Sequence, residues 1–155
     1  MKSRCQRRPA LHQAPRLSPT CGQMSDRYVY LDTSAFMKLI TPEFETAALQ
    51  RYLMSRSLRV SSALLRAEAL RAAARVSLEH VAKVRRQLRK VAMIDISREL
   101  LEQAGGLPPA DMRSFDAIHI AAALSLGDDL GDIVTYDSRM ISAGLTHGLS
   151  VVSPM

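Results

Sequence analysis

The apolar run Tyr28–Leu31 most constrains the fold. An acid, Asp32, follows it directly, and the hydroxyl residues Thr33 and Ser34 come next. A short run of β-branched and aromatic residues predicts a buried strand. The two hydroxyl residues after it favour the start of a helix. Ligands of open α/β sheets bind at the carboxyl ends of the strands. We therefore expect Asp32 to lie in a functional site for which the rest of the chain supplies partners.

Strand and helix patterns alternate along the chain. Strands are predicted at 27–31, 58–61, 91–96, 133–136 and 149–152. Helices are predicted at 33–40, 43–56, 62–76, 77–90, 97–104, 114–126 and 138–144. This alternation predicts an α/β fold with a central parallel sheet of four to five strands flanked by helices on both faces.

The composition limits the class of protein. A chain of 155 residues is long enough for one domain with a proper core. No apolar run approaches the roughly 20 residues of a membrane span, so no membrane partner is expected. Both cysteines, Cys5 and Cys21, lie in the first 25 residues. Their placement excludes a disulfide-built secreted domain and favours a cytoplasmic location.

Residues 1–25 differ from the rest of the chain. They hold five basic residues and no acids, and they lack a periodic apolar pattern. We expect a disordered basic tail at 1–25 and one folded domain over 26–155. The tail has no apolar segment of the kind a signal peptide needs. A transit peptide is one alternative, and a true start at Met24 is the simpler one.

Basic residues are concentrated in the segment 51–90. It carries 11 lysines and arginines against two acids, whereas the other folded segments carry five basic residues and 13 acids. A basic segment favours a polyanion such as nucleic acid as the partner. A solvated helical face is the alternative.

Four acids stand at unusual positions. Asp32 and Asp137 each end a predicted strand, and Glu68 and Asp116 lie in largely apolar predicted helices. Each alone has a structural explanation, such as a cap, a helix-dipole contact or an ion pair with a nearby arginine. Packing several carboxylates together is costly unless a cation neutralises them. The combination therefore indicates a cation site.

The donor chemistry narrows the choice of cation. Carboxylate oxygens, with no cysteine in the folded part and few histidines, favour Mg²⁺, with Mn²⁺ also possible, over Zn²⁺. Such ions lower the pKa of bound water and clamp the oxygens of an in-line displacement at phosphorus. Carboxylates, a divalent metal and a basic segment together suggest phosphodiester hydrolysis.

Five segments carry a likeness to a known family. In chain order they are Asp32-Thr33-Ser34, Glu68 in a Leu/Ala-rich helix, Ser114–His119 before an Ala-rich run, Thr135-Tyr136-Asp137, and Gly148–Val152. In order and approximate spacing the chain resembles the PIN-domain ribonucleases over about residues 27–154. It is most similar to the VapC-type toxins of bacterial toxin–antitoxin pairs. The tail is the main departure, since such toxins usually begin a few residues before the first Asp.

The resemblance implies a PIN fold and Mg²⁺-dependent endonuclease action on RNA, usually by a homodimer that a cognate antitoxin inhibits. Carried over to this chain, it makes the four acids both the catalytic and the metal-site residues, namely Asp32, Glu68, Asp116 and Asp137. Three hydroxyl residues would orient metal-bound water or substrate, namely Thr33, Ser34 and Thr135.

Two surfaces are candidates for partners. The RNA-facing surface is predicted at 75–90, with Lys83, Arg85, Arg86 and Arg89 as the binding residues. A groove for an antitoxin helix is an alternative to core packing for five apolar residues, namely Phe36, Leu39, Phe44, Leu49 and Leu53.

Two further features stay open. His119 follows Asp116 by one helical turn, so it either faces the site or is a packed structural histidine. Asp128, Asp129 and Asp132 are expected in the loop before the fourth strand. They form either a second cation site or a solvated turn.

The favoured function is that of a toxin acting as an endoribonuclease through metal-activated water. The alternative is a non-catalytic RNA- or partner-binding module on a PIN scaffold. A haloacid-type phosphatase domain is disfavoured, because Ser34 stands where such a phosphatase needs a second Asp. A receiver-like domain is disfavoured, because neither an acid pair beside the first strand nor a lysine near the last is evident.

Overall fold

The computed structural model describes residues 27–155. The expectations for a basic tail at 1–25 and for a start at Met24 lie outside these residues. Within the described part of the chain, no helix is long and apolar enough to cross a membrane.

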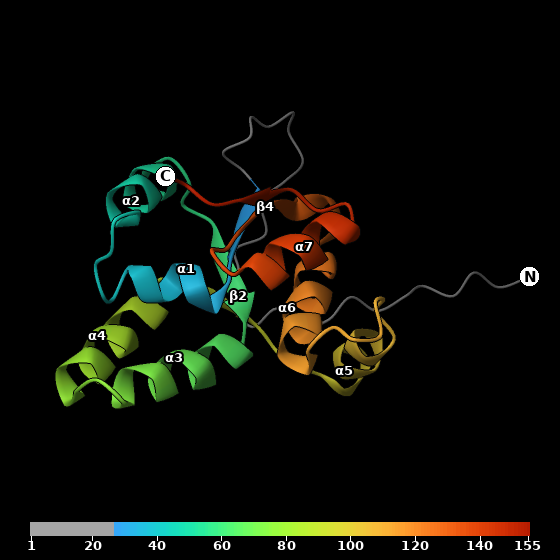
Figure 1. The fold of residues 1–155 in the computed structure, drawn as a ribbon, viewed down its shortest axis with the longest axis horizontal. Helices are drawn as coiled ribbons and strands as arrows, with labels where there is room; N and C mark the ends of the chain where they lie inside the picture. Colours follow the sequence, from blue (N-terminus) through green and yellow to red (C-terminus); the bar gives the residue numbers. More distant parts are fainter. Residues whose placement is uncertain (1–26) are drawn as a thin grey trace, which may run out of the picture.

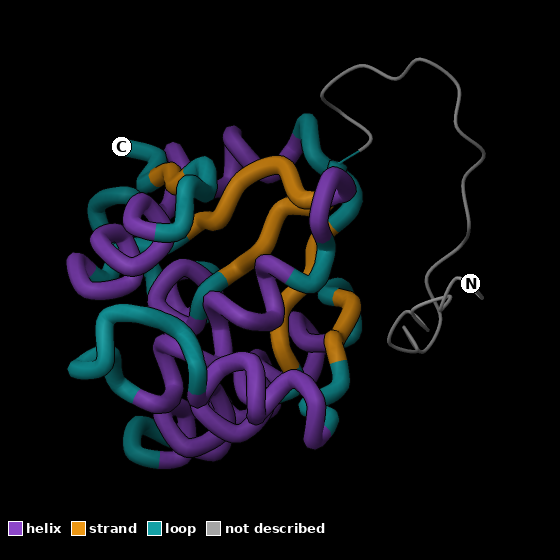
Figure 2. The backbone as a smooth tube through the Cα atoms, turned by 90° about the vertical axis from the view of Figure 1, so that its right-hand side faces the viewer, coloured by secondary structure: helices purple, strands orange, loops and turns teal. Residues whose placement is uncertain are grey.

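The described residues form a five-stranded, all-parallel sheet, which confirms the predicted fold class (Figures 1 and 2). Its strands are β1 (Tyr28–Leu31), β2 (Arg59–Ser62), β3 (Ala92–Ile94), β4 (Leu130–Val134) and β5 (Val151–Val152). The order across the sheet is β3-β2-β1-β4-β5. The chain therefore moves outward from β1 in one direction and returns to build the other half of the sheet.

Helices cover both faces of the sheet, as predicted (Figure 1). They are α1 (Thr33–Lys38), α2 (Thr46–Met54), α3 (Leu64–Ala74), α4 (Leu78–Leu88), α5 (Arg98–Gly105), α6 (Ser114–Leu124) and α7 (Ser138–Thr146). Leu31 faces a core built with α1 to α4, whereas its neighbour Tyr30 faces a core built with α5 to α7. The alternation of side chains along β1 thus assigns each residue to one layer.

Strand β4 begins three residues earlier than predicted. Its pairing with β1 contains a bulge, in which Tyr28 pairs with Leu130 but Tyr30 pairs with Ile133. Gly131 allows the close approach, since a Cβ there would lie 3.3 Å from the Tyr28 carbonyl oxygen. The prediction of a loop up to the fourth strand is therefore wrong for Asp132, which lies in β4.

The three acids expected in one loop are consequently separated. Asp128 and Asp129 belong to the 3₁₀ turn η2 (Gly127–Asp129), whereas Asp132 lies in β4. The Asp132 carboxylate accepts hydrogen bonds from the hydroxyls of Tyr52 and Ser150. Asp132 therefore joins β4 to neighbouring elements through protein donors.

Candidate active site

Asp32 lies at the carboxyl end of β1 and caps α1. Its Oδ2 accepts from the backbone N–H of Ser34 at 3.3 Å and from the hydroxyls of Ser34 and Thr135, each at 2.8 Å. The residue is only 5% exposed. Three donors thus fix the carboxylate, while Oδ1 lies 4.0 Å from His119 Nε2.

Ser34 and Thr135 connect the ends of β1 and β4. Their hydroxyl oxygens lie 3.2 Å apart. Ser34 Oγ accepts from the backbone N–H of Tyr136 at 2.9 Å, and Thr135 Oγ1 accepts from that of Asp137 at 3.1 Å. Thr135 is fully buried. Its hydroxyl is therefore shielded from solvent and positions the carboxylate of Asp32.

Glu68 lies in the second turn of α3 and completes this part of the site. Its Oε2 accepts from the Thr33 hydroxyl at 2.5 Å and lies 2.9 Å from His119 Nε2. Burial opposes ionisation, but the hydrogen bonds from His119 and Thr33 outweigh it and hold the pKa of Glu68 below its ordinary value. Glu68 is therefore an oriented carboxylate at neutral pH.

His119 is both packed in the core and in contact with the site. It is 2% exposed on α6, and its Nδ1 lies 2.8 Å from the Tyr30 hydroxyl. The Tyr30 oxygen accepts from the backbone N–H of Ser62 at 3.0 Å, and burial raises the Tyr30 pKa, so its proton is available to Nδ1. We therefore assign the imidazole proton to Nε2, which donates to Glu68.

Asp116 and Asp137 meet at Arg139. Asp137 caps α7, and the Arg139 Nη2 lies 3.1 Å from its Oδ2. Arg139 Nε lies 3.8 Å from Asp116 Oδ2. Burial, followed by the charge of Asp137, raises the pKa of Asp116 despite Arg139. Negative charge at this position is therefore only partly neutralised.

The four acids thus gather at the carboxyl edge of the sheet, in two groups. Asp32 and Glu68 flank His119, and Asp116 and Asp137 flank Arg139. Among residues 27–155, no three His, Cys, Asp or Glu side chains already converge as ligands of one ion. The fit to a hard cation rests on the all-oxygen donors and on the burial and the neighbouring Asp137 charge that together raise the pKa of Asp116.

The sequence did not identify Tyr30 or Arg139 as parts of this site. Tyr30 belongs to a strand whose alternation indicates only burial. Arg139 follows Asp137 by two residues, and nothing in the sequence marks it as a partner of Asp116. Only the packing of α6 and α7 on the sheet brings either side chain to the acids.

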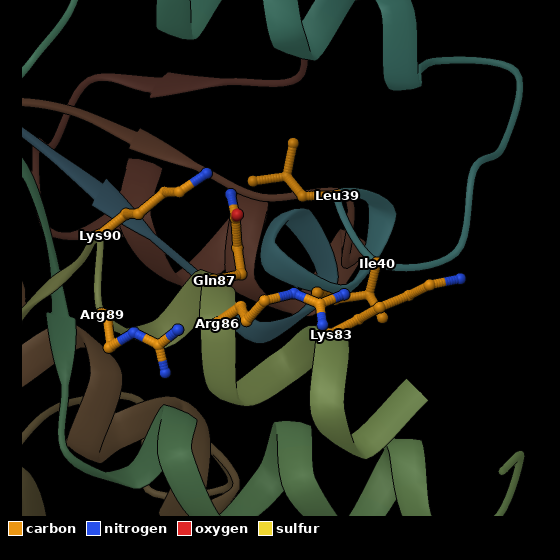
Figure 3. A pocket seen from close by; sticks show the side chains of 7 residues that line it. All are labelled: Leu39, Ile40, Lys83, Arg86, Gln87, Arg89 and Lys90. Carbon is orange, nitrogen blue, oxygen red and sulfur yellow. The ribbon is translucent and has the colours of Figure 1, made fainter. Parts of the chain in front are cut away.

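Three of the four basic residues predicted to bind RNA line a hollow away from the acids. Figure 3 shows Lys83, Arg86 and Arg89 around a hollow of about 360 Å³ that includes Leu39 and Ile40. Leu39 and Ile40 follow the last turn of α1, whereas Asp32 precedes its first turn. The hollow and the acids therefore lie toward opposite ends of α1.

The apolar residues considered for an antitoxin groove are mostly core. Phe36 and Leu49 are fully buried and Leu53 nearly so, which favours the core-packing alternative for these three. Phe44 is 89% exposed in the loop before α2. Leu39 is half-buried at the hollow of Figure 3.

Comparison with known proteins identifies the family. The PIN domain pattern matches residues 29–144. Ribonuclease VapC46 of Mycobacterium tuberculosis is 45% identical over 126 residues, covering 81% of this chain and 97% of that protein. Ribonuclease VapC35 of the same organism is 38% identical over 130 residues, covering 81% and 96%.

Solved structures agree in fold. The crystal structure of Mycobacterium tuberculosis VapC20, a toxin that cleaves the sarcin–ricin loop, has a TM-score of 0.66 at 20% identity and covers 81% of this chain and 99% of that one. A toxin–antitoxin complex from Klebsiella pneumoniae has a TM-score of 0.64 at 20% identity, covering 82% and 98%. Together with the acids at the carboxyl edge, these matches show that the chain belongs to the PIN-domain family and, within it, to the VapC ribonucleases.

Proposed function

We propose that the chain is the toxin of a toxin–antitoxin pair and that it cleaves RNA as a divalent-metal-dependent endoribonuclease. The observation that carries the proposal is the gathering of Asp32, Glu68, Asp116 and Asp137 at one sheet edge. Its support comes from the 45% identity to a ribonuclease over nearly all of that protein.

The four acids would hold Mg²⁺ or Mn²⁺. When bound, such an ion supplies an activated water and neutralises charge that develops on the phosphate. Oxygen donors and uncompensated negative charge suit these ions better than Zn²⁺.

The other polar residues position the acids. Thr135 and Ser34 hold Oδ2 of Asp32, so its orientation does not depend on substrate. Thr33 and His119 hold Glu68 ionised. Because these donors are in place before substrate binds, the acids need little reorganisation during the reaction.

The proposal also covers the bounds of the nuclease domain and the partners of the protein. We propose residues 26–155 as the nuclease domain, which acts as a homodimer and is inhibited by a cognate antitoxin protein. Lys83, Arg85, Arg86 and Arg89 would form a second RNA contact, remote from the acids, that attracts the polyanion over a distance.

Chelation tests the proposal against the alternative of a non-catalytic binding module. Purified protein should cleave single-stranded RNA with Mg²⁺ or Mn²⁺, lose cleavage in EDTA, and regain it when the metal is restored. Gel analysis of end-labelled RNA measures this. Binding of RNA without cleavage under all three conditions would support the non-catalytic module instead.

A further inference from the structure

A second hollow lies beside the acids, on the exposed face of α3. It encloses about 380 Å³ and is lined by Thr33, Glu68, Arg71, Arg75 and Phe115, with Leu64 and small side chains of α3 between them. Thr33 and Glu68 belong to the acid site already described. The hollow therefore opens directly from the site, unlike the one in Figure 3.

Three of these residues form one stripe along α3 and its C-cap residue, Arg75. Glu68, Arg71 and Arg75 are spaced i, i+3 and i+7, which places them on the same helical face. At 1.5 Å per residue, Arg71 lies about 4.5 Å and Arg75 about 10.5 Å from Glu68 along the helix axis. A row of positive charge thus begins next to the acids and leads away from them.

The two arginines are available to a ligand. Both are exposed, and neither forms an ion pair with an acid within residues 27–155. Other cations of the chain do form ion pairs, such as Lys83 with Glu79 at 2.8 Å. The guanidinium groups of this stripe are therefore available to bind an anionic ligand.

Phe115 contributes to the wall of the hollow from α6. Its side chain is 56% exposed, although it immediately precedes the half-buried Asp116. An exposed phenyl ring next to arginines is the combination with which proteins bind single-stranded nucleic acid, because every base offers a flat face for stacking. A base paired in a duplex does not offer that face.

We infer that this hollow, the α3 groove, binds the single-stranded RNA next to the cleaved phosphodiester. Phe115 stacks on one base, and Arg71 and Arg75 bind two phosphates. The inference rests on the proposed ribonuclease function and adds a defined subsite to it. A peptide is the less suitable ligand, because the groove pairs its apolar lining with two unneutralised positive charges.

Binding measurements in a cleavage-silent background test the groove. Every sample carries Asp116→Asn, and fluorescence anisotropy follows a labelled single-stranded RNA as salt is varied. Phe115→Ala should weaken binding about tenfold, and Phe115→Trp should restore it. Arg71→Ala and Arg75→Ala should each reduce the slope of log affinity against log salt by about 0.7.

Matched controls lie off the groove. Phe44→Ala removes a more exposed phenyl ring in the loop before α2, and Arg66→Ala removes an exposed arginine from another face of α3. Both should bind like the parent. Circular dichroism confirms that each variant is folded.

The outcomes separate the groove from the proposed function. If the parent, which carries Asp116→Asn alone, binds no RNA, the proposed ribonuclease function itself is contradicted. If the parent binds RNA but Phe115→Ala and Arg71→Ala bind it as tightly as their control variants, the α3 groove is overturned and the ribonuclease function is not. A Phe115→Ala variant that changes only the oligomeric state in sedimentation also overturns the α3 groove, since the face is then an interface between copies of the chain.

Discussion

Asp116 is a site residue whose ionised form is disfavoured by its surroundings. Burial and the neighbouring Asp137 raise its pKa, and Arg139, at 3.8 Å, does not cancel them. A carboxyl group whose pKa is raised in the folded state favours folding only while it is protonated. That contribution is present below the ordinary carboxyl pKa and is lost as the pH rises through the raised value.

Replacing Asp116 with Asn should therefore stabilise the protein at neutral pH. The ionised carboxylate costs folding free energy there, and the neutral amide does not. We expect a gain of at most about 1 kcal/mol, because the group is partly solvated. Urea unfolding in EDTA at pH 7 and pH 4 measures it, with exposed Asp129→Asn as the control. The gain should shrink at pH 4, and a variant less stable than the parent at pH 7 contradicts this account.

At the scale of elements, one imidazole connects three of them. His119 on α6 accepts from Tyr30 on β1 and donates to Glu68 on α3. The sequence could not separate a packed histidine from a site histidine, because the apolar pattern of α6 is compatible with either. In the structure Nδ1 contacts the buried Tyr30, as a packed histidine would, and Nε2 contacts the site residue Glu68.

A double-mutant cycle between β1 and α6 tests this connection. Tyr30→Phe removes the closer of two hydroxyls at Nδ1, the other being that of Ser62 at 3.3 Å, at a cost of about 1 kcal/mol. His119→Ala leaves buried partners unsatisfied, at a cost of about 2–4 kcal/mol. Both changes remove the same hydrogen bond, so the double variant should be less destabilised than their sum by about 0.5–1.5 kcal/mol. Urea unfolding measures the free energy of unfolding of the three variants. Strict additivity of the two single losses would count against the shared hydrogen bond.

The periodicity of apolar residues predicted the helices and strands, because burying one face of an element imposes that periodicity on its sequence. The strand ending at Asp32 and the apolar helix of Asp116 were recognisable without a structure, and parallel strands necessarily end at one edge. The predicted loop before the fourth strand failed at Asp132, because a bulge admits Gly131 and Asp132 into β4.

The sequence did not predict which basic residues lie near the acids in the folded chain. Arg86 and Arg71 both belong to the basic segment 51–90, yet only Arg71 lines a hollow that includes a site acid. Charge density along a chain does not specify which helix faces the site. That depends on how α3 and α4 pack on the sheet.

At the scale of the whole molecule, the strand order places the site. The chain builds the sheet from β1 toward β3 and then returns to add β4 and β5 on the other side of β1. The order reverses between β1 and β4, and ligands of open α/β sheets bind at such a point. Asp32 follows one of these two strands, and Asp137 comes shortly after the other.

The central claim is that this edge is an RNA-cleaving centre, and one comparison tests it most directly. Nuclease-free preparations of the parent, Asp116→Asn and the control Asp129→Asn are assayed for cleavage of single-stranded RNA with Mg²⁺. Asp129→Asn should cleave like the parent, while Asp116→Asn should lose at least about 100-fold in rate, equivalent to about 2.7 kcal/mol. Cleavage by folded Asp116→Asn at the parental rate would contradict the account.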